Sequence, residues 1–540
     1  MAKKLRIAIA QLNLTVGDIQ GNLAKLIHTA KSARDTLLAD VIVFPELSVT
    51  GYPPEDLLLR KSFLDAANEA LNTFKAEVEN IYCVVGHPHA TSQGLFNSCS
   101  VIYNGTIVGR YAKQYLPNYG IFDEYRYFTP GNTPCVVPIH GIPVGIMICE
   151  DLWQPGPTQQ IANQGARLIL IPNASPFEID KHEQRHLVLA KRAKSAQLPI
   201  IYVNCVGGQD EIVFDGGSMA IDQEGKISQY AGFGCEALLP VDIEISSTQT
   251  TVPSAPFVLP TEEQRVYEAL VLGVKDYIEK NHFPGVLVGI SGGIDSALTL
   301  AIAVDALGKE KVHAVLMPSR YTSEMSTKDA LLLIKNVGVT HDTISIEPVF
   351  NSFLASLSAS FTNTKVDITE ENLQARSRGV LLMALSNKFG RMVLTTGNRS
   401  EMAVGYSTLY GDMAGGLSVL KDVSKTWVYR LAQFRNQLNS VIPTRIIERA
   451  PTAELAPNQT DQDSLPPYDV LDKILELYLN QEQSLEAIVA LGFDQVTVTK
   501  IVDLIHKSEY KRRQAPIGIR INHKAFGRDR RYPITSEYKS

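Results

Sequence analysis

The stretch 288–298, VGISGGIDSAL, contains the turn that decides the fold of the second half of the chain. The apolar, β-branched run 286–290 before it predicts a buried strand, and the apolar series after Ser296 predicts a helix. The small residues between them predict a tight glycine turn. The sequence therefore predicts a strand–turn–helix unit that carries a carboxylate, Asp295, inside the turn.

This turn has the composition of a phosphate-binding loop. Glycines let backbone N–H groups approach an anion, and the start of the following helix adds partial positive charge. The loop is not of the GxxxxGK[ST] type, because it has no lysine and is shorter. Asp295 would repel a polyphosphate unless a hard cation lay between them, which favours a Mg²⁺ ligand. The alternative is an ordinary glycine turn in which an Asp or Ser caps the helix.

The second half contains four strand candidates, of which the first leads into this loop. They lie at 286–291, 313–318, 342–348 and 391–398, and they alternate with longer helical stretches. This alternation predicts a doubly wound parallel sheet, in which ligands bind beyond the carboxyl ends of the strands. We expect mobile loops at 410–425 and at 450–468, of which the second is polar and rich in proline.

Bulk properties limit the function classes. The 540 residues, 45% hydrophobic and 20% charged, predict a soluble protein of two large domains, and the net charge of −6 gives no overall basic surface for nucleic acid or membrane. No run of apolar residues is long enough to span a membrane. The start, MAKKLRIAIAQLN, predicts a first strand rather than a signal peptide. The six cysteines form no CxxC pair, which favours buried thiols and a cytoplasmic location.

A polar, proline-containing segment at 246–256, SSTQTTVPSAP, predicts a linker. Thr261 and Gln264 follow it with the spacing of a capping box, so a new domain is expected to begin there. We therefore expect a first domain at 1–245, a linker at 246–260 and a second domain at 261–540.

The first half is also expected to be α/β. Its strand candidates are RIAIAQLN (6–13), VIVFPEL (41–47), YCVVGHP (82–88), VIYNGTIVGRYAK (101–113), VGIMICEDLW (144–153) and LILIPNAS (168–175). His87 and His89, separated by a proline, are too close together to form a zinc site alone, and we expect GHPH at 86–89 to be a loop.

Three of these strand candidates end in residues that carry chemistry: Glu46, Lys113 and Cys149. A carboxylate can take the proton of a thiol and return it to a leaving amine, while a lysine stabilises the thiolate and the oxyanion. On three neighbouring strand ends, these groups would suffice for acyl transfer from an amide. Each residue alone also has a structural interpretation, namely a buried core cysteine, a helix cap and a surface lysine.

The SGGxDS string at the end of a strand resembles the pyrophosphate-binding loop of the ATP pyrophosphatases. The stretches 371–387, 393–426, 451–472 and 506–516 are similar, in order, to the motifs of the NAD synthetase family. This resemblance covers 261–540 and implies a Rossmann-like domain. The implied ATP contacts are Gly289, Ile290, Ser291, Gly292, Gly293, Ile294, Asp295, Ser296 and Thr396. The implied contacts to nicotinic acid adenine dinucleotide are Asn372, Arg376, Glu401, Lys421 and Lys511, with Asp295 and Glu401 as Mg²⁺ ligands.

The blocks FPELSVTGYPPEDLL, GRYAKQYLPNYGIFDEYRYFTPG and GIMICEDLW resemble the three signature blocks of the nitrilase superfamily, over about residues 4–240. The resemblance implies an αββα sandwich with Glu46 as general base, Lys113 as oxyanion stabiliser and Cys149 as nucleophile. The variant LPNYGIFDEYRYF is similar to the glutaminase domains attached to NAD synthetases. That similarity implies that Tyr119, Ser175 and Lys181 hold glutamine. Glu124 resembles the second glutamate of many superfamily members, which positions substrate or proton. Glu150 would bind the glutamine α-amino group, with helix capping as the alternative, and these five residues make up the expected glutamine site.

Together the resemblances imply that glutamine hydrolysis supplies ammonia to an acyl-adenylate of nicotinic acid adenine dinucleotide, with ATP as substrate and Mg²⁺ as cofactor. They also imply a homo-oligomer formed through the synthetase domain, with no nucleic-acid or membrane partner. Other amide-forming ATP pyrophosphatases are alternatives. Asparagine synthetases, however, use an N-terminal cysteine, whereas residue 2 here is Ala, and GMP synthetases resemble a different, Cys–His–Glu glutaminase. A binding or scaffold protein with inactive domains is a further, non-enzymatic alternative. The presence of Glu46, Lys113, Cys149 and the SGGIDS loop argues against it.

Overall fold

The computed structural model describes residues 3–247, 249–456, 459–463 and 465–537. Contacts divide the chain into two compact units, Met1–Thr261 and Glu262–Ser540, and each is described by itself. Residue 248 of the expected linker and residues 457, 458 and 464 of the expected loop lie outside the described residues. Every helix within the described ranges is too short or too polar to cross a membrane.

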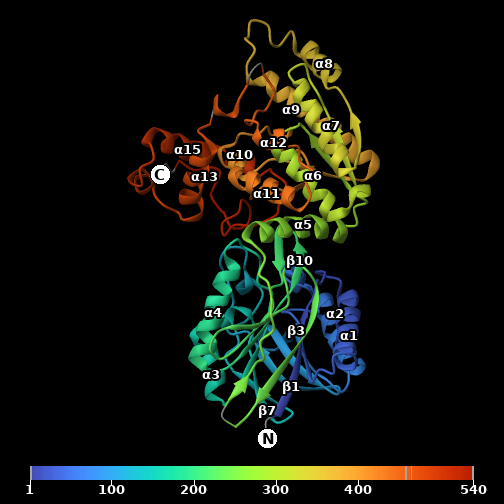
Figure 1. Ribbon diagram of the computed structural model, residues 1–540, viewed down its shortest axis with the longest axis vertical. Coiled ribbons are helices and arrows are strands. Elements are labelled where there is room, and N and C mark those ends of the chain that lie inside the picture. Colours follow the sequence, from blue (N-terminus) through green and yellow to red (C-terminus); the bar gives the residue numbers. More distant parts are fainter. Residues whose placement is uncertain (1–2, 248, 457–458, 464, 538–540) are drawn as a thin grey trace. The chain divides into compact units, whose positions relative to one another are not determined.

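Two β-sheets form the centre of the first unit (Figure 1). The seven-stranded sheet has the order β15 (Thr250–Thr251), β14 (Ala237–Ile245), β1 (Lys3–Gln11), β2 (Val41–Val43), β3 (Tyr82–Thr91), β4 (Gly94–Tyr103), β5 (Thr106–Ala112). The six-stranded sheet has the order β13 (Ile227–Tyr230), β12 (Met219–Ile221), β9 (Ile200–Asn204), β8 (Leu168–Asn173), β7 (Ile142–Ile146), β6 (Cys135–Ile139). A separate hairpin pairs β10 (Val206–Gln209) with β11 (Ile212–Asp215).

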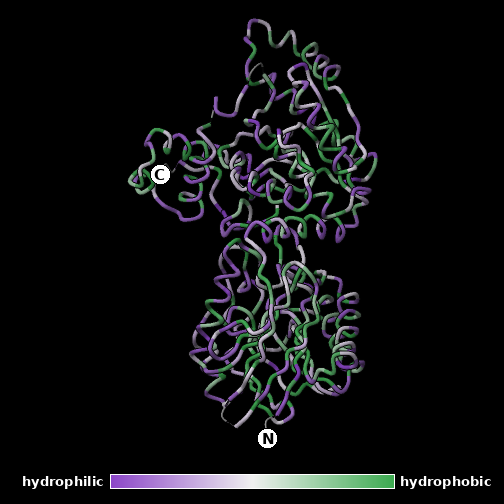
Figure 2. Tube along the Cα trace, viewed as in Figure 1, coloured by the Kyte–Doolittle hydropathy of each residue, from purple (hydrophilic) through white to green (hydrophobic). Residues whose placement is uncertain are grey.

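Alternation along the strands explains the layers. In β1, Leu5, Ile7 and Ile9 belong to a core that joins both sheets, whereas Ala8 and Ala10 pack with the helices on the outer face. The helices are α1 (Ile19–Asp35) and α2 (Lys61–Glu77) on the first sheet and α3 (Pro155–Asn163) and α4 (Lys181–Ala196) on the second. Short 3-10 helices are η1 (Glu55–Leu59), η2 (Glu124–Arg126) and η3 (Cys149–Leu152). The predicted αββα sandwich is confirmed, and Figure 2 shows both hydrophilic and hydrophobic residues along its outer helices.

Two local predictions for this unit are wrong. Residues 101–113 are not one strand but a hairpin, because Asn104 and Gly105 take φ of 46° and 75° and form the turn between β4 and β5. The segment 86–89 is not a loop but part of β3. There, His87 is buried, and its Nε2 lies 2.8 Å from the Ser100 hydroxyl in β4. The neighbouring strand thus supplies a hydrogen-bond partner for an imidazole ring that we expected to lie in a loop.

The second unit contains one six-stranded sheet whose neighbouring strands are all parallel. Its order is β18 (Thr340–Thr343), β17 (Val312–Leu316), β16 (Val286–Ile290), β19 (Met392–Thr395), β20 (Leu417–Ser418), β21 (Ile517–Gly518). The order reverses between β16 and β19, which is where a doubly wound sheet opens a crevice for ligands. The predicted doubly wound fold is confirmed.

Helices flank this sheet and extend the unit toward its C-terminal end. They are α5 (Glu262–Lys280), α6 (Ile294–Leu307), α7 (Glu324–Val337), α8 (Glu347–Leu357), α9 (Ile368–Phe389), α10 (Arg399–Val404), α11 (Lys425–Leu438), α12 (Thr444–Glu448), α13 (Tyr468–Leu475), α14 (Leu485–Ala490), α15 (Gln495–Lys507) and α16 (Glu509–Arg512). Two short 3-10 helices, η4 (Lys309–Lys311) and η5 (Asp461–Asp463), and one π-helix, η6 (Glu476–Asn480), also lie in this unit. Side chains of Ser323 and Asp367 accept backbone N–H bonds and thereby begin α7 and α9.

Candidate active sites

Lys113 lies at the centre of the first site. Its ammonium is buried and lies 2.7 Å from Glu46 Oε1 and 2.8 Å from Glu124 Oε1. Glu46 follows β2 and Lys113 follows β5, both in the seven-stranded sheet. One cation is therefore shared by two buried carboxyl groups.

Two further polar residues complete this cluster. Asn97 in β4 donates from Nδ2 to Glu46 Oε1 at 2.7 Å, and the Tyr52 hydroxyl donates to Glu124 Oε1 at 2.8 Å. The sequence analysis did not select either residue. Asn97 is the one amide in a strand whose other side chains are apolar or small, and a buried amide needs a hydrogen-bond partner, which is the signal that could have identified it.

Glu124 is the carboxyl group of this cluster whose pKa lies near neutral pH. Burial raises the pKa of Glu124 to about 7, with Lys113 opposing the rise and Glu46 adding to it. Burial alone would lower the pKa of Lys113, but Glu124 and Glu46 outweigh it and hold that pKa well above its usual value. Lys113 therefore stays charged, while Glu124 can gain or lose a proton near neutral pH.

Cys149 reaches the cluster from the other sheet. It is the first residue of η3 and lies three residues after the end of β7. Its φ is 44°. Burial raises the pKa of its thiol well above the usual value, and Glu46 adds to the rise, whereas the Lys113 charge and the backbone N–H of Ala174 lower it. The thiol is thus held as a neutral group beside both a carboxylate and an ammonium.

The expectation of three neighbouring strand ends is wrong in its topology. Strands β3 and β4 separate β2 from β5, and β7 belongs to the second sheet. The three residues come together because the two sheets pack face to face. How the two sheets pack determines which of their side chains meet, and a local sequence pattern carries no information about that packing.

The residues expected to bind glutamine lie near the thiol or the carboxyl pair. The Tyr119 hydroxyl donates to Glu150 Oε2 at 2.9 Å, and the Lys181 charge lowers the pKa of Glu150, which burial raises. Lys181 Nζ lies 4.7 Å from the centroid of the Trp153 ring. Ser175, two residues after β8, donates its backbone N–H to Asn204 Oδ1 at 2.8 Å. Their roles in binding glutamine stay predictions.

A buried arginine supports the Ser175 segment. Arg185 in α4 pairs with Asp215 at 2.7 Å and donates to the Ser175 and Pro176 carbonyls, both at 2.8 Å. Removing one member of a buried ion pair leaves the other charge without compensation. We expect Arg185→Met to lower the free energy of unfolding of the first unit by about 3–5 kcal/mol.

The measurement uses the fact that the chain has only two tryptophans. In a Trp427→Phe background, Trp153 fluorescence follows urea unfolding of the first unit alone. The control is Asp242→Asn, which breaks an exposed pair with Arg6 and should cost about 1 kcal/mol or less. Equal effects of the two substitutions would contradict the prediction.

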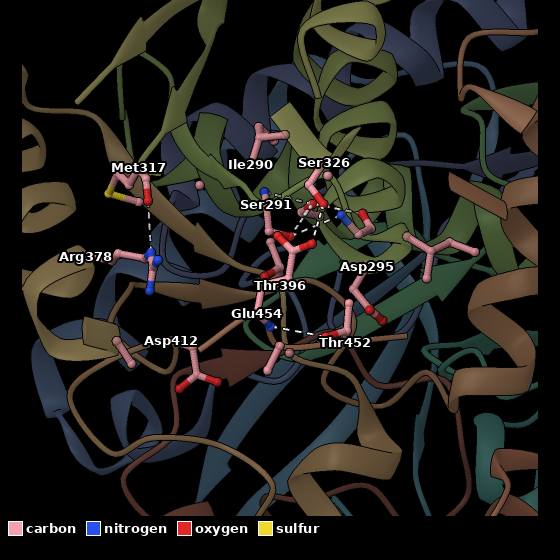
Figure 3. A pocket seen from close by; sticks show the side chains of 18 of the residues that line it. Ile290, Ser291, Asp295, Met317, Ser326, Arg378, Thr396, Asp412, Thr452 and Glu454 are labelled. Atoms are coloured by element: carbon pink, nitrogen blue, oxygen red, sulfur yellow. Dashed lines mark hydrogen bonds between the residues drawn. The ribbon is translucent and has the colours of Figure 1, made fainter. Parts of the chain in front are cut away.

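The second site is a cavity of about 310 Å³ at the carboxyl ends of β16 and β19. All residues expected to contact ATP line it, namely Gly289, Ile290, Ser291, Gly292, Gly293, Ile294, Asp295, Ser296 and Thr396. Figure 3 shows Ser291, Asp295, Thr396 and Thr452 around this cavity. Position 292 requires a glycine, because its φ is 86° and a Cβ there would lie 2.5 Å from the Ser326 carbonyl oxygen.

A lysine that the sequence analysis did not select bridges the two acidic residues of this cavity. Lys425 Nζ lies 2.5 Å from Asp295 Oδ2 and 3.2 Å from Glu401 Oε1. Asn398 fixes both acids, since its Nδ2 donates to Asp295 Oδ1 at 2.9 Å and its Oδ1 accepts from Glu401 N at 3.0 Å. Burial raises the pKa of Glu401 to about 7, and Lys425 opposes that rise.

The donor set of this cavity fits Mg²⁺. Asp295, Glu401 and Asp461 all line it and supply carboxylate oxygen, the ligand that Mg²⁺ prefers. Within the described ranges, no group of three or more potential ligands is arranged as a complete metal site. One or two carboxylates suffice for Mg²⁺, because it keeps waters and takes further oxygens from substrate phosphates.

Four residues expected to contact the dinucleotide form hydrogen bonds beside this cavity, three of them to backbone carbonyls and Asn372 to a side chain. Lys511 Nζ donates to the Gly405 and Ser407 carbonyls, both at 2.8 Å, and Lys421 Nζ donates to the Pro516 carbonyl at 2.6 Å. Arg376 Nε donates to the Leu409 carbonyl at 3.2 Å, and Asn372 Oδ1 accepts from the Thr408 hydroxyl at 2.8 Å. Of the described residues that line this cavity, none is one of these four. Their contact with a dinucleotide stays a prediction.

The loop after α12 forms one wall of the cavity. Glu454 accepts from the Ser326 hydroxyl at 2.7 Å and from Arg449 at 2.6 Å, which ties the loop to the start of α7 (Figure 3). Arg378 in α9 also lines the cavity and donates from Nε to the Met317 carbonyl at 3.1 Å. The sequence analysis did not select these residues, because their partners come from other segments of the chain.

Comparison with known families defines the class of each unit. The carbon-nitrogen hydrolase family matches residues 6–252, and the NAD synthase family matches residues 266–515. The chain is thus a carbon-nitrogen hydrolase unit followed by an NAD synthase unit.

Relatives with the same two units cover the whole chain. The glutamine-dependent NAD(+) synthetase of Xylella fastidiosa is 48% identical over 100% of both chains, and that of Thermotoga maritima is 46% identical over 99% of both. A solved structure of the Acinetobacter baumannii enzyme in complex with ADP is 45% identical, covers 98% of both chains and has a TM-score of 0.81. The chain belongs to the glutamine-dependent NAD(+) synthetase family.

Proposed function

We propose that this enzyme converts nicotinic acid adenine dinucleotide to NAD⁺, with ATP as the activating substrate and glutamine as the nitrogen donor. The observation that carries the proposal is that one chain contains both a buried Cys–Glu–Lys cluster and a nucleotide-sized cavity lined by SGGIDS. The two reactions are derived separately below.

In the first unit, Glu46 takes the proton of Cys149, and the thiolate attacks the side-chain amide carbon of glutamine. Lys113 stabilises the negative charge that forms on the carbonyl oxygen. The proton returns to the leaving nitrogen, the C–N bond breaks, and ammonia leaves a glutamyl thioester. Water then hydrolyses the thioester to glutamate and restores the thiol. Tyr119, Glu124, Glu150, Ser175 and Lys181 hold the glutamine.

In the second unit, the N–H groups of Ser291–Ser296 and the Lys425 ammonium hold the phosphates of ATP. Bound Mg²⁺, held by Asp295 and Glu401, would offset the charge on the phosphates. The nicotinate carboxylate attacks the α-phosphorus and pyrophosphate leaves. Ammonia then attacks the acyl carbon and AMP leaves. Asn372, Arg376, Lys421 and Lys511 bind the dinucleotide.

Neutral ammonia must reach the acyl-adenylate, because its protonated form is not nucleophilic and dominates at physiological pH. We propose that a shielded passage carries it from the glutaminase site to the synthetase site. The proposal also includes a homo-oligomer formed through the synthetase unit and a cytoplasmic location.

The test incubates the purified chain with ATP, Mg²⁺, glutamine and nicotinic acid adenine dinucleotide. We expect NAD⁺, AMP, pyrophosphate and glutamate in equal amounts. Formation of ADP and phosphate in place of AMP and pyrophosphate would contradict the adenylate, and NAD⁺ without glutamate would contradict the nitrogen source.

Metal removal should separate the two reactions. With excess EDTA, we expect NAD⁺ formation to stop, because the charge on the phosphates is no longer offset. Glutamine hydrolysis, measured as glutamate without ATP, should continue, since the described cluster around Cys149 uses carboxylates and an ammonium. Restored NAD⁺ formation on adding Mg²⁺ is the control. Loss of glutamate formation with EDTA would contradict this division.

A further inference from the structure

Asp151 lies two residues after Cys149, is fully buried, and has no part in the reaction derived above. We propose that Asp151 is a positioning residue that holds the Cys149 turn against the segment carrying Lys113. The inference rests on the proposed roles of Cys149 and Lys113 and adds a residue that sets their relative placement.

Both oxygens of this carboxylate are used. Oδ1 accepts the backbone N–H groups of Gln114 at 3.1 Å and Tyr115 at 2.8 Å. Oδ2 accepts the Tyr111 hydroxyl at 2.8 Å and the backbone N–H of Ile148 at 3.3 Å. Four donors therefore converge on one side chain.

These donors belong to the two segments that carry the reactive groups. Tyr111, Gln114 and Tyr115 flank Lys113 at the end of β5, in the seven-stranded sheet. Ile148 precedes Cys149 after β7, in the six-stranded sheet. A single carboxylate thus joins the two sheets at the point where thiol and ammonium must meet.

The backbone at Cys149 needs such support. A non-glycine residue in the left-handed region, here with φ of 44°, costs about 1–2 kcal/mol. The bond from Ile148 N–H to Asp151 Oδ2 closes the turn on both sides of Cys149. Asp151 therefore stabilises the conformation that presents the thiol.

The electrostatic environment keeps Asp151 an acceptor. Burial raises its pKa to about 6, while bonds from Tyr111 and Tyr115 and the Lys113 charge oppose the rise. The thiol itself faces Glu46, Glu150 and Lys113, and it interacts with the hydroxyls of Tyr52, Tyr119 and Tyr202. Of these charged groups, Lys113 alone lowers the pKa of the thiol.

The test substitutes Asp151→Asn in the full chain. The amide keeps one acceptor oxygen but presents N–H groups toward the Ile148 N–H, so the turn should shift relative to Lys113. We expect kcat for glutamine hydrolysis to fall about 10- to 100-fold, as for other small displacements of reacting groups, with KM for glutamine little changed. NAD⁺ formation from ammonium should be unchanged.

A second readout separates positioning from general damage. The rate at which iodoacetamide abolishes glutamine hydrolysis, measured against pH, reports the ionisation of Cys149. We expect the Asp151→Asn curve to move to higher pH, because the thiolate loses stabilisation by Lys113. Tyr111→Phe, which removes one donor, should move it less in the same direction. Asp242→Asn, an exposed carboxylate change, should leave it in place.

An unshifted curve in Asp151→Asn overturns the inference, even if kcat falls, because it would mean a structural role alone. If that variant does not fold, Tyr111→Phe decides, and a wild-type curve and kcat in it overturn the inference. Failure of the proposed function is distinct, since it would appear as glutamine hydrolysis that survives Cys149→Ala.

Discussion

Cys149→Ala is expected to abolish NAD⁺ formation from glutamine while leaving NAD⁺ formation from ammonium intact. The loss should be at least about 10³-fold, because the substitution removes the proposed nucleophile, without which the thioester cannot form. The cluster of Glu46, Lys113 and Glu124 remains, but these groups are paired with one another and supply no thiolate to form the thioester. The measurement is the rate of NAD⁺ formation with each nitrogen donor at saturating ATP.

Cys235→Ser is the matched control for this prediction. Its side chain is exposed, whereas that of Cys149 is buried against Glu46 and Lys113. We expect both nitrogen donors to support NAD⁺ formation in Cys235→Ser as in the wild type. Loss of the ammonium-dependent reaction in Cys149→Ala would count against separate sites for the two reactions.

Gly292→Ala should have the opposite selectivity and lower NAD⁺ formation from both donors. Its Cβ would lie 2.5 Å from the Ser326 carbonyl oxygen, at a φ of 86° that side chains rarely adopt. The loop that we propose to hold the phosphates must therefore move by a large fraction of an ångström, which we expect to cost about 100-fold in rate. Glutamine hydrolysis without ATP should be unchanged.

Gly308→Ala separates the steric clash from backbone strain. Gly308 has a φ of 78°, close to that of Gly292, but a Cβ there would meet no atom within 4 Å. Because its ψ of 151° places it in a region that is essentially restricted to glycine, we expect the substitution to lower the free energy of unfolding by about 1–3 kcal/mol and to leave NAD⁺ formation unaffected. If Gly292→Ala and Gly308→Ala have the same activity, the close approach of Ser326 is not what constrains the loop.

The sequence was sufficient for the fold of both units and for the part of the cavity that the glycine loop 289–296 and Thr396 line. Each of these inferences depends on a contiguous pattern. The strand–glycine–helix unit at 286–298 is local, and the parallel order then follows from alternating strands and helices. The αββα sandwich came from the resemblance of three contiguous blocks.

The details that the sequence did not reveal depend on contacts between distant segments. Asn97 meets Glu46 only because of the register of β4, and Lys425 meets Asp295 across 130 residues of chain. Asp151 is one of two acids after Cys149, and nothing in that short stretch says that its partners flank Lys113. Register and sheet packing fix these pairs, and neither is visible in a single sequence.

The burial of the thiol has a consequence for the durability of the enzyme. Oxidants attack thiolates, and a thiol that stays protonated between turnovers offers peroxide little to react with. Because burial and Glu46 both raise the pKa of Cys149, the proposed nucleophile stays a protonated thiol between turnovers. The exposed Cys235, rather than the reactive centre, is then the residue that meets oxidative chemistry first.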